Sequence, residues 1–303
     1  MKTVLSSAKK TVVISPDDPF VVIGERINPT NRKKLAEELR RFDYTRVKAD
    51  ALAQVQAGAQ VIDVNCGVPG ADEPAILKGA VEVLQATIEA PLSLDSSVVE
   101  ALEAALPAYR GKALINSVTG DDKLLDRLLP VVKQHHAAVI GITHDESGIS
   151  NDPKARLAVA QKIVRRAMEH GIPKEDVIID PICMPIGANT KLGAVTLETI
   201  RLVRQELGVN LSIGAGNVGF GLPDRPTQTA SIILLGMALG LTASIANPLE
   251  HEIYRAVLAG DLMLGRDSFG MRWMGYYRKR EAEAKAAAAL AAAPATEPPN
   301  PVP

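Results

Sequence analysis

The stretch VIDVNC, from Val61 to Cys66, is a short run of mostly apolar residues that ends in polar side chains. A run this short and this rich in Val and Ile is typical of a strand buried on both faces of a parallel sheet. The same pattern recurs along the chain, so that eight strands are predicted. They are VVIGER (Val21 to Arg26), VIDVNC, LSLDS (Leu92 to Ser96), ALINS (Ala113 to Ser117), VIGIT (Val139 to Thr143), VIIDP (Val177 to Pro181), LSIGAGN (Leu211 to Asn217) and ASIAN (Ala243 to Asn247).

The segments between these runs have the features of helices. Helices are predicted over residues 43–57, 97–108, 121–135, 153–170 and 197–207. Most of them begin with an acidic or capping residue and end at glycine or proline, as helices do. Eight buried strands that alternate with helices predict an α/β fold, a closed (β/α)8 TIM barrel, which needs roughly 250 residues.

The 303 residues divide into three parts. Residues 1–20 are expected to form a loose N-terminal arm that ends in the turn sequence SPDDP, and the barrel is predicted over residues 21–280. Residues 281–303 change from an Ala/Glu/Lys stretch to a proline-rich end. This composition predicts a helical turn or two followed by a disordered tail.

Charge and cysteine content exclude several classes of protein. Lys and Arg number 34 and Asp and Glu 35, so neither a nucleic-acid partner nor an anionic membrane surface is predicted. Cys66 and Cys183 are too few for a disulfide framework or a zinc cluster, and we expect free buried thiols. No signal peptide or membrane span is recognised, because the longest apolar stretch, residues 231–246, is short and broken by glycines. A cytoplasmic protein is expected.

Polar residues at the strand ends are the candidate functional residues, because a barrel of this type gathers its strand ends on one rim. They are Glu25, Arg26, Asn28, Asp63, Asn65, Asp95, Asn116, Asp180, Asn217 and Asn247. This set lacks the histidines that a hydrolytic triad or a zinc site would use, so no metal site is predicted. Carboxylates and amides suit a flat heterocycle with several donors and acceptors, although each could instead cap a helix or fix a loop.

An ordered series of motifs then resembles one family. The motifs are GERIN (Gly24 to Asn28), IDVN (Ile62 to Asn65), LDSS (Leu94 to Ser97), INS (Ile115 to Ser117), IDP (Ile179 to Pro181) and GNVGFGLPDR (Gly216 to Arg225). In this order they resemble the methyltetrahydrofolate:corrinoid protein methyltransferases, a family of pterin-binding barrels. The resemblance covers the whole barrel.

The resemblance implies a role for each matching residue. Asp95, Asn116 and Asp180 match the residues that hold the pterin ring, and Asn217 matches the catalytic amide that approaches N5. Arg225 matches an arginine that packs near the pterin. A further set, Glu25, Asn28, Asp63 and Asn65, matches polar rim positions of the binding site. The family's motif around Asn217 is usually S-N-V-S, whereas this chain has G-N-V-G.

The same resemblance implies methyl transfer between N5 of tetrahydrofolate and the cobalt of a corrinoid, in a direction that the sequence leaves open. No D-x-H-x-x-G motif for binding a corrinoid is found, so a separate corrinoid protein is expected as partner. A homodimer is a family expectation. Two other functions stay open: an enzyme like dihydropteroate synthase, which the sequence ASIANP at strand eight disfavours, and a non-catalytic pterin-binding subunit of a corrinoid complex.

Two further stretches allow more than one interpretation. The glycine-rich GAGNVGFG (Gly214 to Gly221) could cradle a phosphate, or could let the backbone pass close to a flat ligand. The late aromatics Phe269, Trp273, Tyr276 and Tyr277 have helical spacing. They are expected to pack a last helix against the barrel or against a second subunit.

Overall fold

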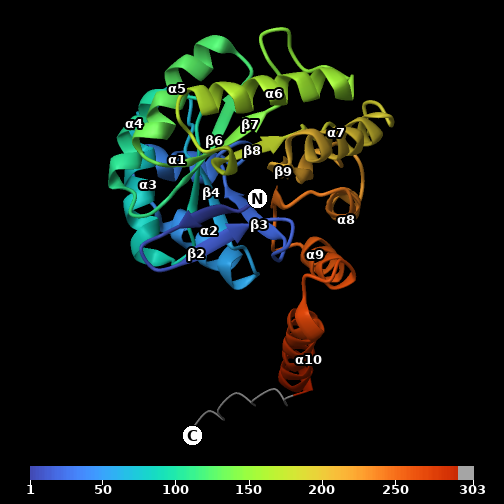
Figure 1. Cartoon of the computed structure of the whole chain (residues 1–303). Helices are drawn as coiled ribbons and strands as arrows, with labels where there is room; N and C mark the ends of the chain where they lie inside the picture. Colours follow the sequence, from blue (N-terminus) through green and yellow to red (C-terminus); the bar gives the residue numbers. More distant parts are fainter. Residues whose placement is uncertain (293–303) are drawn as a thin grey trace, which may run out of the picture.

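A closed barrel of eight parallel strands forms the centre of the molecule (Figure 1). This computed structural model describes the backbone of residues 1–292 and the side chains of residues 1–286. The barrel strands are β3 (Val21–Ile27), β4 (Val61–Asn65), β5 (Leu92–Asp95), β6 (Leu114–Thr119), β7 (Ala138–Ile142), β8 (Val177–Asp180), β9 (Asn210–Gly214) and β10 (Ala243–Ala246). They follow one another in sequence order around the barrel, and β10 pairs with β3 to close it. The predicted fold class is therefore confirmed.

Helices surround the barrel on its outside. They are α1 (Lys33–Arg40), α2 (Thr45–Gln56), α3 (Glu73–Thr87), α4 (Val99–Ala105), α5 (Asp122–Gln134), α6 (Pro153–Glu169), α7 (Leu192–Leu207), α8 (Arg225–Ala238) and α9 (His251–Met263), and a further helix, α10 (Met271–Ala292), follows them. The side chains of Asp72, Asp121 and Asp152 cap the N-termini of α3, α5 and α6 by accepting a backbone N–H of the first turn. Such caps satisfy donors that the helix itself leaves free.

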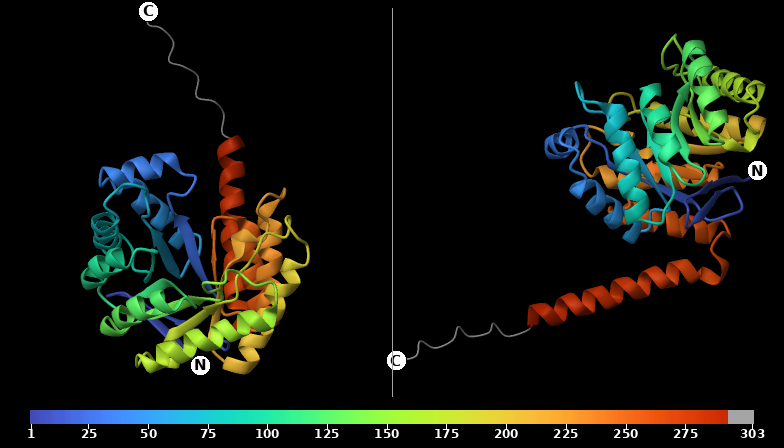
Figure 2. Two further views of the ribbon diagram at one scale, coloured as in Figure 1. Left: turned by 90° about the horizontal axis from the view of Figure 1, so that it is seen from above. Right: turned by 90° about the vertical axis from the view of Figure 1, so that its left-hand side faces the viewer.

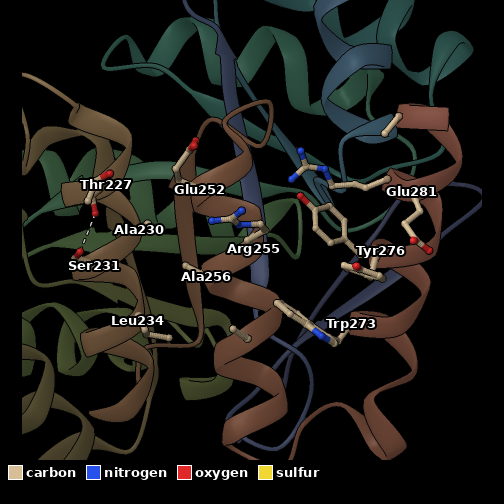
Figure 3. Close-up of a pocket in the computed structure, with 14 residues that line it drawn as sticks. Thr227, Ala230, Ser231, Leu234, Glu252, Arg255, Ala256, Trp273, Tyr276 and Glu281 are labelled. Atoms are coloured by element: carbon tan, nitrogen blue, oxygen red, sulfur yellow. Dashed lines mark hydrogen bonds between the residues drawn. The ribbon is translucent and has the colours of Figure 1, made fainter. Parts of the chain in front are cut away.

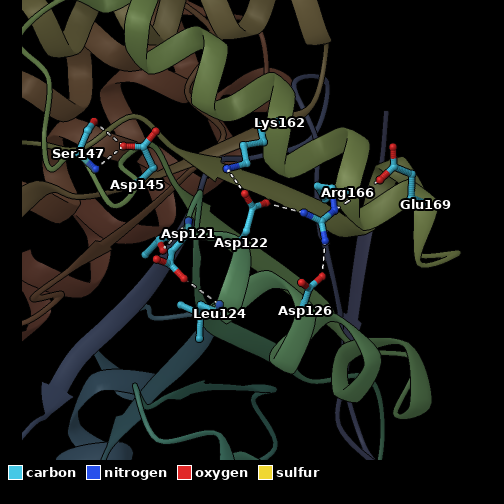
Figure 4. A network of polar contacts seen from close by, with 10 residues as sticks. Asp121, Asp122, Leu124, Asp126, Asp145, Ser147, Lys162, Arg166 and Glu169 are labelled. Carbon is cyan, nitrogen blue, oxygen red and sulfur yellow. Dashed lines mark hydrogen bonds and ion pairs between the residues drawn. The ribbon is translucent and has the colours of Figure 1, made fainter.

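Neighbouring helices are also joined by ion pairs on the surface. Asp122 of α5 accepts from Lys162 at 3.1 Å and from Arg166 at 2.5 Å, and both basic residues lie on α6 (Figure 4). Arg166 also pairs with Asp126 and Glu169. Exposed ion pairs of this kind contribute little individually, so the network mainly fixes how the two helices lie against each other.

The N-terminal residues differ from the expectation of a loose arm over residues 1–20. They form an antiparallel hairpin of β1 (Thr3–Ser6) and β2 (Thr11–Ile14). Leu5 and Ile14 are fully buried in a cluster with barrel residues such as Leu114 and Ile178. Since these barrel residues lie toward the N-terminal ends of their strands, the hairpin closes that end of the barrel.

The last helix, α10, is longer than predicted and projects away from the barrel (Figures 1 and 2). Asp261, a fully buried residue of α9, accepts the backbone N–H of Phe20 at 3.0 Å and also binds the guanidinium of Arg272. One carboxylate thus ties α9 to the start of α10 and to the entry of the first barrel strand. The predicted disordered tail falls largely on residues 293–303, which lie outside the described residues.

Two further expectations concern buried thiols and membrane spans. Cys66 and Cys183 are free and buried, and burial raises the pKa of each thiol to about 12. Within residues 1–292, no helix combines the length and the apolar character needed to cross a bilayer.

Candidate functional site

The residues proposed from the strand ends lie in the barrel strands or in the turns that directly follow them. Asp63 and Asn65 are on β4, Asp95 is the last residue of β5, and Asn116 is on β6. On the other side of the barrel, Asp180 ends β8, and Asn217 ends a short 3-10 turn, η3 (Ala215–Asn217), directly after β9. The ends of parallel strands in a barrel share one rim, where enzymes of this fold place their chemistry.

Asp63 is the centre of a buried hydrogen-bonded cluster. Its Oδ1 accepts from the hydroxyl of Ser93 at 2.6 Å and from Nδ2 of Asn116 at 3.1 Å. Asp63 and Asn116 are only 4% and 9% exposed. The carboxylate therefore fixes the orientation of the Asn116 amide, which leaves the amide oxygen of Asn116 as its remaining acceptor.

A second amide–carboxylate pair lies beside the first. Nδ2 of Asn65 donates to Oδ2 of Asp95 at 2.9 Å, and Oδ1 of Asn65 accepts from the backbone N–H of Gly67. Burial raises the pKa of Asp95, and burial together with the neighbouring Asp95 carboxylate raises the pKa of Asp63. Two close carboxylates with little access to water favour retention of a proton between them.

Asp180 stands at the turn that follows β8. Its Oδ1 accepts from the backbone N–H of Ile182 at 2.7 Å. Burial raises the pKa of Asp180 to about 6, against the opposing effects of the Ile182 and Gly214 amides and of the Arg156 guanidinium. At neutral pH the carboxylate is thus mostly ionised, although it is poorly hydrated.

Glu25 reaches the rim through an irregularity in β3, where the pairing with β4 shifts between Gly24 and Ile27. The buried side chain of Gln54 replaces the lost ladder contact, since its Oε1 accepts from the backbone N–H of Arg26 at 2.9 Å. A Cβ at Gly24 would lie 2.5 Å from that oxygen, so any other residue there would displace the Gln54 amide. Bulges of this kind re-aim side chains, and here the shift accompanies the placement of Glu25.

Arg225, at the start of α8, lies against Glu25 and the backbone of η3. Its Nε donates to the carbonyl of Gly216 at 2.6 Å. A Cβ on Gly216 would lie 3.1 Å from Nη2 of Arg225 and 3.4 Å from Oε1 of Glu25, and one on Gly219 would lie 2.9 Å from Cγ of Arg225. The two glycines that flank Asn217 and Val218 therefore make room for Arg225, an explanation that the sequence did not suggest.

Burial raises the pKa of Glu25, while the charges of Arg225 and Arg26 oppose that rise. Asn217, by contrast, is exposed, and its Nδ2 lies 3.2 Å from where a Cβ of Gly214 would be. An exposed amide on a backbone held by η3 and Arg225 is free to meet a ligand.

Two of the predicted polar residues bond within their own loops. Oδ1 of Asn28 accepts from the backbone N–H of Thr30 at 2.9 Å. Oδ1 of Asn247 accepts from the backbone N–H of Leu249 at 3.2 Å, and its Nδ2 donates to Oε1 of Glu250 at 3.2 Å. These contacts are the loop-fixing role that was the alternative interpretation of such residues. The side-chain hydrogen bonds of Asn28 and Asn247 among the described residues do not join them to the other rim residues.

Several residues at the site were not predicted from sequence. Ser93 points inward from within β5, Gln54 lies in the last turn of α2, and Arg156 lies in the first turn of α6. Each is buried and bonds to a residue at least 25 positions away. A signal was present only in the residue types, since polar side chains on the buried face of an element need a partner.

Taken together, the rim offers carboxylates and amides from several directions. A carboxylate accepts two parallel N–H donors, and an oriented amide supplies one donor and one acceptor. Both are suited to the edge of a flat amino-heterocycle. The raised pKa values of Asp63, Asp95 and Asp180 indicate acceptors that lack water and would gain from such donors.

The sequence comparisons agree with this class of site. The family model for pterin binding enzymes matches residues 24–247, which is most of the barrel. The chain therefore belongs to the family of pterin binding enzymes.

Within that family, the chain is similar over nearly its whole length to a methylcorrinoid:tetrahydrofolate methyltransferase of Eubacterium limosum. The two are 27% identical over 268 residues, which are 86% of this chain and 97% of that protein. It is also 26% identical over 242 residues to the methionine synthase of Mycobacterium tuberculosis, of which the match spans only 20%.

Solved structures with a similar fold include dihydropteroate synthases. The Yersinia pestis enzyme with a pterine-sulfa conjugate has a TM-score of 0.63 at 17% identity, covering 86% of this chain and 98% of that one. The Xanthomonas albilineans enzyme with 4-aminobenzoic acid has a TM-score of 0.65 at 20% identity, covering 87% and 98%. These likenesses support the barrel fold and nothing finer.

Proposed function

We propose that this protein transfers a methyl group between N5 of tetrahydrofolate and the cobalt of a corrinoid carried by a separate protein. The observation that carries the proposal is the placement of four side chains around one rim. Asp95 and Asp180 end β5 and β8, Asn116 of β6 is paired with Asp95 in the register, and Asn217 ends η3 directly after β9. The similarity to a methylcorrinoid:tetrahydrofolate methyltransferase over 97% of its length supports this choice within the family. The proposal covers transfer in either direction.

Asp95, Asn116 and Asp180 are proposed to bind the pterin edge. The ring's N–H donors would meet the Asp95 and Asp180 carboxylates, and its acceptor would meet an amide such as that of Asn116. Asp63 and Asn65 would act by holding Asn116 and Asp95, to which they are bonded at 3.1 and 2.9 Å. Glu25 and Arg225 are proposed to line the pocket beside η3, while Asn28 would act by shaping its loop.

Asn217 is proposed as the catalytic residue. A methyl group on N5 is a poor electrophile, because the departing folate would carry negative charge on nitrogen. A hydrogen bond from an amide held at the end of η3 would stabilise the charge that develops at N5. The corrinoid supplies a strongly nucleophilic cobalt, and the barrel's part is to orient the folate toward it.

The experiment is a methyl-transfer assay with methyltetrahydrofolate and free cob(I)alamin. Asn217→Ala should lower kcat about a hundredfold, as loss of one well-placed donor does, with the tetrahydrofolate Kd within about threefold of wild type. The matched control is Gln134→Ala, which removes an exposed amide at the end of α5, away from the carboxyl ends of the strands. Normal turnover by Asn217→Ala would contradict the role of this residue.

The same assay separates the other two functions. Folate binding without turnover in the wild-type protein would indicate a non-catalytic pterin-binding subunit. Condensation of a dihydropterin with para-aminobenzoate would indicate a dihydropteroate synthase. Either result would overturn the proposal.

We also propose that the protein forms a homodimer through the surface of α8, α9 and α10. Ten exposed large apolar side chains fall between residues 234 and 277. They are Leu234, Leu235, Leu249, Leu262, Met263, Leu264, Phe269, Met271, Met274 and Tyr277. Exposed apolar surface this concentrated is typical of an interface.

A cavity of about 730 Å³ lies in this surface between α8, α9 and α10 (Figure 3). Trp273 and Tyr276 of α10 face it. Its lining also includes two anions, Glu252 and Glu281, and the cations Arg255 and Arg280. A contact with two-fold symmetry presents one patch to itself, so a patch with balanced charges complements its own copy. A second copy of the chain is therefore the occupant that we propose for this patch.

A further inference from the structure

Arg156 is a fully buried arginine behind the proposed pterin site. It is the largest side chain of the structure with no exposed surface, and it lies near the N-terminus of α6. Among the described residues, no carboxylate forms an ion pair with it within 4.0 Å. A buried guanidinium is unfavourable unless its donors are satisfied, so the bonds that it makes deserve a functional explanation.

Two of the three guanidinium nitrogens of Arg156 bind backbone carbonyls, and the third, Nη2, has no hydrogen-bond partner among the described residues. Nη1 donates to the carbonyls of Pro181 at 2.8 Å and Ile182 at 2.9 Å, and Nε donates to the carbonyl of Ser150 at 2.7 Å. One planar group therefore joins the loop before α6 to the turn after β8. Arginine suits this task because its donors lie in a rigid fork.

The turn held by Arg156 is in an unusual conformation. Ile182 has φ of 60°, in the left-handed region that a β-branched residue rarely adopts. Its carbonyl accepts from Arg156 and, at 2.9 Å, from the hydroxyl of Thr196. Its N–H donates to Oδ1 of Asp180 at 2.7 Å. The peptide groups of Ile182 thus connect the guanidinium to the carboxylate of Asp180.

We propose that Arg156 is a positioning residue for pterin binding: it fixes the Ile182 turn and thereby the orientation of the Asp180 carboxylate. This inference rests on the proposed function, because it assumes that Asp180 binds the pterin. The groups that act on the Asp180 carboxylate are the backbone amides of Ile182 and Gly214 and the charge of Arg156. That charge also opposes the rise of the Asp180 pKa that burial causes.

The test compares tetrahydrofolate binding by wild type, Arg156→Gln and Arg156→Lys as a function of pH, measured by calorimetry. Arg156→Gln should weaken binding at pH 7 by about tenfold or more, as the loss of charge-assisted bonds does. Its midpoint for loss of binding on acidification should lie at higher pH than in wild type. Arg156→Lys keeps the charge but not the fork, so affinity should fall while the midpoint stays near that of wild type.

Arg166→Gln is the control, since it removes an arginine of the same helix from the surface ion-pair network (Figure 4). It should bind as wild type does. Thr196→Val provides a second route if Arg156→Gln does not fold, because it removes only one hydroxyl bond to the Ile182 carbonyl and one to that of Leu192. Weaker folate binding by folded Thr196→Val would support the role of the turn.

The outcomes are distinguishable. If wild type fails to bind tetrahydrofolate, the proposed function is wrong, and this inference fails with it. If wild type binds and the folded Arg156 variants bind with the same affinity and pH midpoint, only the positioning role is wrong. If Thr196→Val is the only variant that folds and it binds tetrahydrofolate with wild-type affinity, the positioning role is also wrong.

Discussion

Two opposing effects act on the pKa of Asp180, and together they indicate how this residue could bind a ligand. Burial raises its pKa to about 6, while two backbone amides and the charge of Arg156 favour the ionised form. An ionised carboxylate with so little water is unfavourable in the unliganded protein. The N–H donors of a pterin would relieve that cost, because their hydrogen bonds would replace those to water that the carboxylate loses on folding.

Asp180→Asn should therefore weaken tetrahydrofolate binding about a hundredfold while stabilising the unliganded protein. The unfolded pKa is about 3.9 and the folded pKa is about 6, so wild type loses the stability associated with protonated Asp180 as pH rises through about 6. The increase in the free energy of unfolding that Asp180→Asn causes should be about 1 kcal/mol larger at pH 8 than at pH 5. Urea unfolding at both pH values measures it, and an equal gain at both would contradict this account.

For single residues, the sequence predicted which side chains lie at the rim better than it predicted their hydrogen-bond partners. Asp95 and Asp180 could be placed because each follows an apolar run and ends its strand, and Asn116 follows such a run within β6. Their partners could not be, since Asn116 bonds to Asp63, 53 residues earlier, and Asp180 is held through Ile182 by Arg156. Such contacts depend on which elements the closed barrel brings together.

Among the elements, the barrel strands were predictable and the N-terminal hairpin was not. The strands of the hairpin are four residues each, TVLS and TVVI, and they are too short for a clear alternating pattern. Their apolar faces are buried only because the barrel end is there to receive them. The nearby Asn210 confirms the fit, since its Nδ2 donates to the carbonyl of Ile14 at 2.7 Å.

Because the hairpin closes the end of the barrel opposite the rim, it should contribute to stability and not to binding. Leu5→Ala should lower the free energy of unfolding by about 2–5 kcal/mol, as expected for a fully buried leucine. Val4→Ala, at a neighbouring residue that is 40% exposed, should change it by less than about 0.5 kcal/mol. Chemical denaturation measures both, and tetrahydrofolate affinity should be unchanged in each. Equal losses from the two variants would show that the hairpin does not pack as described.

At the scale of the whole molecule, different faces carry different functions. The rim holds the proposed folate pocket, and the opposite end is sealed by the hairpin. The side formed by α8, α9 and α10 carries the exposed apolar patch. The sequence suggested that the late aromatics pack a last helix on the barrel or on a second subunit, and helical spacing alone could not separate these. Trp273 and Tyr276 line a cavity beside α9, whereas Phe269 is 98% exposed.

The proposed dimer can be tested by the mass of the protein in solution. Sedimentation should give about twice the monomer mass of 32.2 kDa for wild type. Tyr277→Glu should weaken the dimer about tenfold or more, because it introduces a charge into an apolar contact. Met168→Glu is the control, since Met168 lies on α6 and is 52% exposed, against 55% for Tyr277.

All proposed pocket residues come from a single barrel, so the Tyr277→Glu monomer should retain methyl transfer to free cob(I)alamin at a rate close to that of wild type. A loss of activity that parallels the loss of the dimer would show that the second copy completes the site. Wild type that sediments as a monomer at micromolar concentration, or Met168→Glu that dissociates as readily as Tyr277→Glu, would instead exclude this face as the interface. The apolar patch over α8, α9 and α10 would then have to meet a different protein, and the corrinoid partner would be the first to test.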